Sequence, residues 1–304
     1  MKKIVLLIVS AVIGATAWSQ TICEGGYASV MLHRGTPQAG EGGFSVSPST
    51  RVKFSLGNLN FSECSDNGGY FYFATNQWDY QANTYCNCDN NYSNNTDLFC
   101  YGTSGYTDGI VTANVPTLCW NDTDMGRMYI GNLAGTRFDW GVYNAIKYGE
   151  QTYPAGTWRT LTADEWNYLL NTRTNAATLR SAGKVNDKDG LILLPDNWVL
   201  PTDKTFTPGL SMNNRGDQNT YTDEAWTAME NAGAIFLPAA GCIAKLDNGE
   251  TDNLLTGYCC YITATQDGDT NKMMRIDFGA GDTAPRIEPV NKNVRSSVRL
   301  VQNY

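Results

Sequence analysis

Hydrophobic and polar residues alternate in several stretches of the chain, which is the pattern of strands that bury one face. The first stretch, FSVSPSTRVKFSLGNLNF at 44–61, predicts a strand, a turn and a second strand. The aromatic stretch YFYFATNQWDY at 70–80 predicts a further strand. Alternation returns in KMMRIDF at 272–278 and SSVRLV at 296–301, which we expect to pair back into a sheet.

Two other stretches follow the period of a helix. In LTADEWNYLLNTR, Thr162 and Glu165 form a capping box, in which each side chain satisfies a backbone N–H of the other residue. Trp166, Leu169 and Leu170 follow with helical spacing and form one apolar stripe. The pattern predicts a short helix that packs on the core through this stripe.

A second helix is predicted in TDEAWTAMENAG at 222–233. Thr222 is a suitable N-cap, acidic residues fill the first turn, and Gly233 is a suitable end. The face that we expect to point inward holds Ala225, Trp226 and Met229. Apolar runs after the two helices, at 191–194 and 234–237, predict buried strands.

The order of these elements predicts one α+β domain at 44–304, with mixed and antiparallel sheets and two short helices. Residues 20–43 are rich in Gly and aperiodic, so we interpret them as a flexible lead-in. Residues 81–124 are dense in Asn, Tyr, Cys, Gly and Asp and predict a long system of surface loops.

The first 19 residues have the features of a secretory signal peptide. A basic start precedes an apolar run at 4–13 and an A-x-A cleavage site at 15–17, with an alternative cut after Ser19. The apolar run is too short to span a membrane as a mature helix. Cys23 lacks the small preceding residue of a lipoprotein signal, so we expect no lipid anchor. The product is expected to be exported, to the periplasm, the cell surface or the medium.

Charge excludes one class of partner. The formal net charge is -8 at pH 7, and the chain has one His and no basic cluster, so it is a poor candidate for binding nucleic acid. Charged residues make up only 17% of the chain, whereas Gly (30) and Tyr (17) are plentiful. That composition is typical of an extracellular domain rich in loops and strands.

Nine cysteines follow the signal peptide, and disulfides are the default in an exported protein. An odd number leaves at least one thiol free or paired with another molecule. We expect disulfides to staple the long loops, and the connectivity stays open. The candidate cysteines are Cys64, Cys86, Cys88, Cys100, Cys119, Cys242, Cys259 and Cys260.

Several segments in order resemble a family of exported Bacteroidetes proteins built around the Fibrobacter succinogenes major paralogous domain. They are FSVSPSTRVKFSLGNLNF, NQWDY, DLFCYGTSGY, NLAGTRFDWGVYNAI, TWRTLTADEWNYLLNTR, LILLPDNW, AGAIFLPAAG and SVRLV. The resemblance implies a C-type-lectin-like fold related to the formylglycine-generating enzyme, in which the Ser-Val-Arg strand closes the sheet. The chain departs from the family at 261–265, Tyr-Ile-Thr-Ala-Thr, and at Arg295-Ser296, which puts any function of that C-terminal surface in doubt.

A calcium-dependent sugar site is suggested by Trp120-Asn121-Asp122, the tripeptide that closes such sites in many C-type lectins. In those lectins a Glu-Pro-Asn loop comes first, whereas here Glu288-Pro289 lies far downstream and is followed by Val290. The order is reversed, so we interpret the tripeptide as a coincidence.

An EF-hand-like spacing occurs at Asp267, Asp269 and Asn271. Its sixth position is Lys272 instead of Gly, and its twelfth is Phe278 instead of Glu. We therefore predict no metal site with assignable ligands and no cofactor, and a structural calcium ion stays open.

Catalytic arrangements are poorly supported. The single histidine, His33, lies in the flexible lead-in and is a poor base for a nucleophile. The adjacent Cys259-Cys260 does not match the spaced thiol pair of the related oxidase. Glycoside hydrolysis needs two carboxylates across a cleft, and no pair can be selected among 30 acidic residues. We predict no catalytic residues.

Binding through aromatic loops is the remaining chemistry, because Tyr and Trp offer rigid, amphipathic surfaces for sugar rings or protein partners. The candidate ligand-binding residues are Tyr101, Tyr106, Trp120, Tyr258 and Tyr261. Thr283, in Asp282-Thr283-Ala284, resembles a Bacteroidetes O-glycosylation site.

We therefore expect an exported, non-enzymatic binding or adhesion module that recognises an extracellular glycan or an envelope protein and has no membrane span. The alternatives are a structural or assembly component of the cell envelope and, third, an enzyme acting on polysaccharide.

Overall fold

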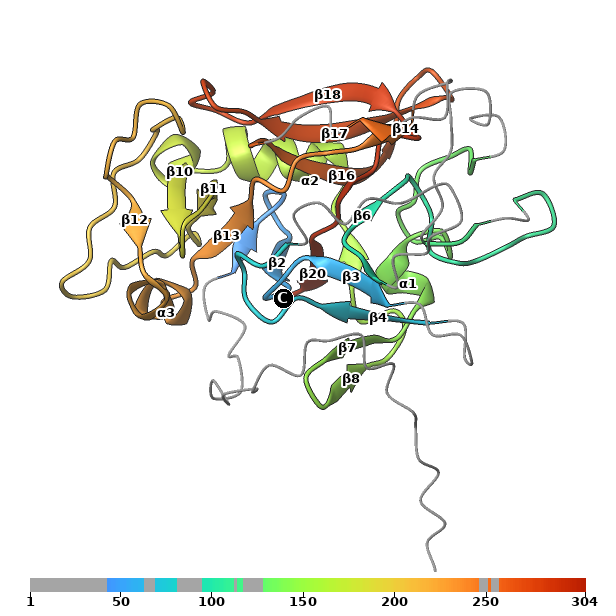
Figure 1. Cartoon of the computed structure of the whole chain (residues 1–304), viewed down its shortest axis with the longest axis horizontal. Helices are drawn as coiled ribbons and strands as arrows, with labels where there is room; N and C mark the ends of the chain where they lie inside the picture. The colour runs from blue at the N-terminus through green and yellow to red at the C-terminus, as the bar shows by residue number, and fades with distance from the viewer. Residues whose placement is uncertain are drawn as a thin grey trace, which may run out of the picture. The chain divides into compact units, whose positions relative to one another are not determined.

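Strands from distant parts of the chain pair with one another in the computed structural model, which describes residues 43–62, 69–80, 95–111, 114–116, 128–245, 251–252 and 257–304. The strands of these residues form five sheets, mostly antiparallel, and the helices are few and short (Figure 1). The architecture of the described residues is therefore mixed α+β. No helix among them has the length and apolar character needed to cross a membrane.

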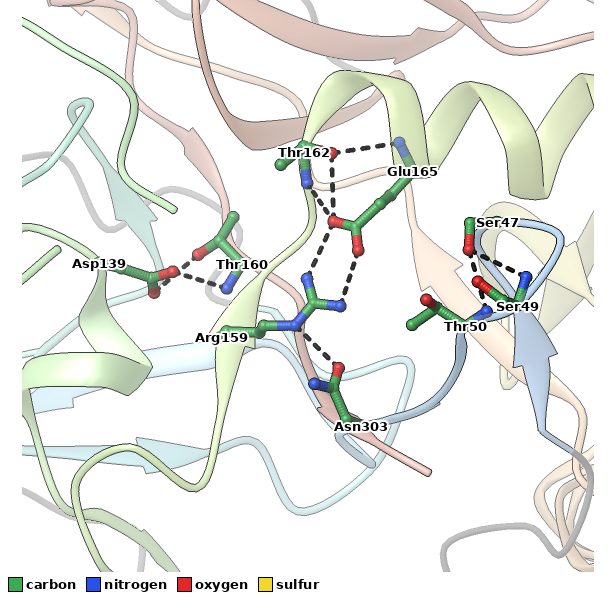
Figure 2. Close-up of polar contacts among 9 residues, drawn as sticks. All are labelled: Ser47, Ser49, Thr50, Asp139, Arg159, Thr160, Thr162, Glu165 and Asn303. Atoms are coloured by element: carbon green, nitrogen blue, oxygen red, sulfur yellow. Dashed lines mark hydrogen bonds and ion pairs between the residues drawn. The ribbon is translucent and has the colours of Figure 1, made fainter. Parts of the chain in front are cut away.

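One sheet joins the beginning and the end of the described chain. Its order is β1-β2-β20-β9, and every pairing is antiparallel. The strands are β1 (Phe44–Ser45), β2 (Arg51–Phe54), β20 (Leu300–Asn303) and β9 (Arg159–Thr160). The Ser47 hydroxyl accepts hydrogen bonds from the backbone N–H of Ser49 and Thr50 and closes the β1–β2 turn (Figure 2). The predicted strand, turn and strand are confirmed here.

A second sheet has the order β5-β3-β4-β7-β8, and a third has the order β18-β17-β16-β19-β6. The second comprises β5 (Asn95–Thr96), β3 (Leu59–Ser62), β4 (Tyr70–Phe73), β7 (Ile146–Tyr148) and β8 (Gln151–Tyr153). The third comprises β18 (Arg286–Asn291), β17 (Lys272–Phe278), β16 (Cys259–Gln266), β19 (Ser296–Ser297) and β6 (Leu98–Phe99). The predicted strand at 272–278 is thus confirmed, and the stretch at 296–301 divides between two sheets.

The fourth sheet, β12-β10-β11-β13, contains both apolar runs that follow the helices. It comprises β12 (Thr220–Tyr221), β10 (Arg180–Val185), β11 (Lys188–Leu193) and β13 (Ile235–Pro238), and a separate pair joins β14 (Ala244–Lys245) to β15 (Thr251–Asp252). Both predicted buried strands are confirmed, since 191–194 lies largely in β11 and 234–237 in β13.

The two predicted helices are confirmed. Helix α2 (Ala163–Asn167) carries the capping box between Thr162 and Glu165, and it continues into one π-helical turn, η2 (Tyr168–Thr172). Helix α3 (Asp223–Asn231) begins at its N-cap Thr222. Two further short elements are α1 (Trp140–Tyr143) and the 3₁₀ turn η3 (Ala176–Thr178). The stripe residues of α2 and η2 and the inward residues Trp226 and Met229 of α3 are buried, while Ala225 is half-buried.

The predicted strand at 70–80 is wrong in its second half, because the strand ends at Phe73. The chain then turns, and Gln77 inserts its buried amide beside β13. This amide donates to the carbonyl of Ala234 (3.2 Å) and accepts from the backbone N–H of Phe236. It therefore satisfies backbone groups that would otherwise pair with a neighbouring strand. The guanidinium of Arg299 reaches the same place and donates to Gln77 Oε1 (3.2 Å) and to the carbonyl of Phe236 (3.0 Å).

Apolar side chains gather in three clusters. One fills the space around β3, β4, β6 and α1 and includes Phe99 and Trp140. Another lies between β2, α2, β16 and β17 and includes Trp166. The third lies under α3 and includes Trp226 and Phe236. Burial of such large side chains supplies about 25 cal/mol per Å² of apolar area, the main stabilising term of a fold built from short strands.

Candidate functional site

An aromatic cluster forms where the loops before β7 meet α1. Tyr129 stacks on Phe138 with 3.9 Å between ring centroids and 18° between planes. Tyr106 packs edge-on against Phe138 at 5.2 Å and contacts Tyr143 at 5.2 Å. We call these four residues the aromatic loop cluster. Its members come from three separate segments of the chain, so the fold assembles it.

The four residues of the cluster differ in their exposure to solvent. Phe138 is buried, Tyr106 and Tyr129 are half-buried, and Tyr143 is 40% exposed. The exposed Arg137 guanidinium lies 5.4 Å from the ring centroid of Tyr106. A set of aromatic rings with one buried anchor, phenol groups at the edge and a cation beside them can stack on an apolar ring face and bond polar groups at its edge.

Hydrogen bonds from α1 fix the loop at 103–104. The indole Nε1 of Trp140 donates to the carbonyl of Thr103 (2.9 Å), and the Asn144 amide donates to the carbonyl of Ser104 (2.9 Å). The Ser104 hydroxyl donates in turn to the carbonyl of Arg137 (2.7 Å). These bonds hold Tyr106 against Phe138 and Tyr143, although the two segments are more than 30 residues apart.

Asp139 anchors the same region to the rest of the protein. Its carboxylate caps α1 by accepting from the backbone N–H of Gly141 (3.2 Å), and it accepts from both the backbone N–H and the hydroxyl of Thr160 in β9 (Figure 2). Burial raises the pKa of Asp139 to about 6, against the opposing effect of these hydrogen bonds. Glycine at position 141 allows α1 to lie this close to the backbone of Trp158, since a Cβ there would lie 2.4 Å from the carbonyl oxygen of Trp158. The carboxyl is fully buried, so it positions α1 and cannot contact a ligand.

A second polar anchor lies one residue away on β9. Arg159 forms a two-pronged ion pair with Glu165 (2.9 and 2.7 Å) and donates through Nε to Asn303 (3.0 Å), which ties α2, β9 and β20 together (Figure 2). Glu165 Oε2 also accepts from the backbone N–H of Thr162 (2.9 Å), so one carboxylate serves both the capping box and the ion pair.

Lys292 holds the segment that carries Tyr129. Its buried ammonium donates to the carbonyl of Tyr129 (2.8 Å) and to Oε1 of Gln266 (2.6 Å), and it lies 5.0 Å from the ring centroid of Tyr101. Burial lowers the pKa of Lys292 to about 8. Gln266 Oε1 also accepts from the backbone N–H of Gly131 (2.7 Å), so this contact fixes 129–131 on both sides.

Two of the predicted ligand-binding residues lie in the core, and that part of the prediction is corrected. Tyr101 is 1% exposed, and its hydroxyl donates to the carbonyl of Gly131 (3.0 Å). Tyr261 is fully buried, and its hydroxyl donates to the carbonyl of Pro238 (3.1 Å). Burial raises the pKa of both phenols. Their rings are enclosed by packing and offer no face to a ligand.

The other predicted binding residues differ in their placement. Tyr106 belongs to the aromatic loop cluster. Tyr258 is half-buried and lies over Gly279, where an added Cβ would come within 2.0 Å of its ring. Trp120 lies outside the described residues. Thr283 is exposed, and its backbone carbonyl accepts a hydrogen bond from Arg180 (2.8 Å).

The acidic residues with EF-hand-like spacing form the turn between β16 and β17. Asp269 accepts from the backbone N–H of Asn271 (3.0 Å) and lies 3.8 Å from the Lys272 ammonium, so its carboxylate has local partners. Asp122 and the rest of the lectin-like tripeptide lie outside the described residues. Within the part of the chain that the structure describes, no group of three His, Cys, Asp or Glu residues could hold a metal ion.

No disulfide joins the described cysteines to one another, so the structure gives no support to the predicted staples. Cys242, Cys259 and Cys260 are buried thiols. Cys100 donates through its sulfur to the carbonyl of Asn293 (3.4 Å). The remaining candidates, Cys64, Cys86, Cys88 and Cys119, lie outside the described residues, as does His33.

The sequence did not single out Tyr129, Arg137, Phe138 or Tyr143, although three of them lie in or beside the segment NLAGTRFDWGVYNAI. The available signal was the density of aromatic residues in that segment. Comparison of the chain with protein-family models, with curated proteins and with solved structures gives no match.

Proposed function

We propose that the protein is an exported, non-enzymatic binding module with a C-type-lectin-like fold, and that its aromatic loop cluster recognises a glycan. One observation carries the proposal: Tyr143 exposes 40% of its surface beside the half-buried Tyr106, with the Arg137 guanidinium over the latter ring. Sugars present an apolar face of C–H groups and an edge of hydroxyls. Stacked phenols with a neighbouring cation complement both.

The rigidity of the loops supports a binding role. Two of the contacts described above, Asp139 with Thr160 and Lys292 with the carbonyl of Tyr129, fix both sides of the cluster in advance. A ligand that meets a preorganised surface loses less affinity to the ordering of side chains and loops. Loops that are fixed by a scaffold are also the usual place of binding residues.

The proposed C-type-lectin-like fold and the proposed export are based on the sequence. The eight segments that resemble the Fibrobacter succinogenes major paralogous domain imply a sheet closed by the Ser-Val-Arg strand, and β20 follows Arg299 directly and lies between β2 and β9. That arrangement supports a C-type-lectin-like fold. The features of a signal peptide at 1–19 support export, and an exported protein would meet extracellular glycans.

The test is binding of the purified protein to a broad glycan array, in calcium and again in chelator. We expect saturable binding to a defined group of glycans that persists in chelator, because stacking needs no metal. Binding that chelator abolishes would contradict the aromatic mechanism and direct attention to Asp122 or Asp267. The absence of glycan binding in both conditions would overturn the glycan proposal in favour of a protein partner or an assembly role in the envelope.

A further inference from the structure

Arg137 carries a positive charge beside the exposed rings of the aromatic loop cluster. Its side chain is exposed, and its guanidinium carbon lies 5.4 Å from the ring centroid of Tyr106, within the range of a cation–π contact. Tyr106 in turn contacts the exposed ring of Tyr143, with 5.2 Å between centroids. The guanidinium and the Tyr143 ring are therefore both adjacent to Tyr106, within reach of one short stretch of glycan.

Arg137 differs from every other arginine that the structure describes. Each of the others forms an ion pair with a carboxylate or donates to a backbone carbonyl, as Arg159 does with Glu165 (2.7 Å) and Arg299 with Phe236 (3.0 Å). The Arg137 guanidinium has no such acceptor among the described residues. Acceptors are not scarce, since the chain has 30 acidic residues against 22 basic ones. The N–H donors of Arg137 are therefore open to a ligand.

Two acidic residues lie in the segments that form the cluster, and both are held by other partners. Asp139 is fully buried, and its carboxylate is occupied by α1 and β9. Asp108 is exposed, and its Oδ1 accepts from the backbone N–H of Ile110 (2.9 Å) and of Val111 (2.8 Å). Since neither carboxylate forms an ion pair with Arg137, the positive charge is not neutralised locally by these two acids.

The backbone that carries Arg137 is fixed, although its side chain is exposed. Its carbonyl accepts from the Ser104 hydroxyl (2.7 Å), which ties it to the loop at 103–104. The next residue, Phe138, is buried, and its backbone N–H donates to the Thr136 hydroxyl (3.2 Å). The guanidinium therefore extends from a rigid base, and a ligand that binds it loses less affinity to the ordering of the loop.

We propose that the glycan carries a sugar acid, whose carboxylate binds Arg137 while a sugar ring stacks on Tyr143; this inference rests on the glycan binding proposed above. The planar guanidinium presents paired N–H donors that match the two oxygens of a carboxylate. A uronic acid holds its carboxylate directly on the sugar ring, whereas a sulfate ester is attached through a further oxygen and is less fixed. The net charge of -8 disfavours a long polyanion, so the expected ligand has a single sugar acid among neutral sugars.

The experiment measures binding of the purified protein to oligosaccharides that carry one glucuronic or galacturonic acid on neutral sugars. Each is presented as the free acid and as its neutral methyl ester, beside sulfated and neutral oligosaccharides, and in chelator so that calcium cannot bridge the carboxylate to the protein. We expect the free acid to bind roughly tenfold more tightly than the ester. Equal binding of acid and ester, binding confined to neutral glycans, or a preference for sulfate would overturn this inference and leave glycan recognition standing. The absence of binding to every glycan would overturn both proposals.

Three variants assign the preference to Arg137. Arg137→Gln is expected to bind acid and ester equally, with an affinity close to that of the wild type for the ester. Arg137→Lys is expected to keep part of the preference, since an ammonium retains the charge but lacks the planar fork. Arg286→Gln is the matched control and should keep the full preference, because it removes an arginine with 51% of its side chain exposed that is paired with Asp282. A preference that survives in Arg137→Gln, or that Arg286→Gln loses to the same extent, would overturn the assignment.

Discussion

Asp139 accepts hydrogen bonds from both the backbone N–H and the hydroxyl of Thr160, at 2.9 and 3.0 Å. These two bonds and the N-cap bond to Gly141 fix α1, and with it the aromatic loop cluster, on the edge of the sheet that contains β9. The contact connects a fully buried charge in the scaffold to the placement of partly exposed rings at the surface.

The first prediction concerns pH. Burial raises the pKa of Asp139 from its ordinary value of 3.8 to about 6, so the folded protein binds the proton more tightly than the unfolded chain does. The contribution of this group to stability is fully present below about pH 4 and is lost as pH rises through 6. The difference in unfolding free energy between the wild type and Asp139→Asn should therefore fall by about 2 kcal/mol between pH 4 and pH 7.

Denaturant unfolding of the two proteins across that pH range is the measurement. Asp139→Asn serves as the reference for the wild type, because the other carboxylates titrate in both proteins and their contributions cancel in the difference. A difference that is constant with pH, or that grows as pH rises, would contradict the buried state of this carboxyl.

The second prediction concerns the carboxylate of Glu165. Glu165→Ala removes both the capping box of α2 and the ion pair with Arg159, and it should lower the unfolding free energy by about 1 to 2 kcal/mol. Glu224→Ala is the matched control, since Glu224 also lies in the first turn of a helix but is exposed and has only a 3.5 Å contact with Thr222. Chemical denaturation should show a change below about 0.5 kcal/mol for the control. Equal losses in both variants would refute the role assigned to the ion pair and capping box.

The third prediction concerns Gln77. Gln77→Leu keeps most of the volume but leaves the N–H of Phe236, the carbonyl of Ala234 and a guanidinium N–H of Arg299 without this partner inside the protein. The cost should be about 2 to 4 kcal/mol of unfolding free energy. The exposed Gln151 of β8 is the control, and Gln151→Leu should change stability by less than about 0.5 kcal/mol. A neutral Gln77→Leu would show that the amide does not replace a strand beside β13.

The fourth prediction separates Tyr261 from ligand binding. Tyr261→Phe removes a buried hydroxyl that bonds the carbonyl of Pro238 and lies 3.3 Å from Oδ1 of Asn58. The variant should lose about 1 to 2 kcal/mol of stability and should bind glycan on the array as the wild type does. Reduced glycan binding by a variant that is still folded would contradict the prediction and show that Tyr261 contributes to binding.

Local signals predicted the helices well, because capping depends on residues that are close in sequence. Thr162 with Glu165, and Thr222 before two acids, marked both N-termini correctly. The prediction of a strand at 70–80 was wrong after Phe73, because the Gln77 amide bonds backbone groups at β13. These groups lie more than 150 residues away, and no local pattern reveals such a partner.

The site was predicted less well than the fold. Tyr101 and Tyr106 have similar neighbours in sequence, yet one lies in the core and the other in the aromatic loop cluster. In CCYITATQ, apolar residues occupy both faces of β16, so the alternation could not show that Tyr261 points inward. The cluster itself depends on bonds from Trp140 and Asn144 to the loop at 103–104, which only the tertiary structure brings together.

The most direct measurement compares Tyr143→Ala with Tyr70→Ala on the same glycan array. Tyr70 is a matched control, since it is 37% exposed, contacts Tyr72 at 5.7 Å and has the Lys147 ammonium 4.2 Å from its ring centroid. We predict that Tyr143→Ala weakens glycan binding by roughly tenfold or more, the effect of losing about 1.4 kcal/mol, and that Tyr70→Ala leaves it unchanged. Equal affinity in the wild type and Tyr143→Ala, or a loss confined to Tyr70→Ala, would contradict the assignment of the aromatic loop cluster as the binding site.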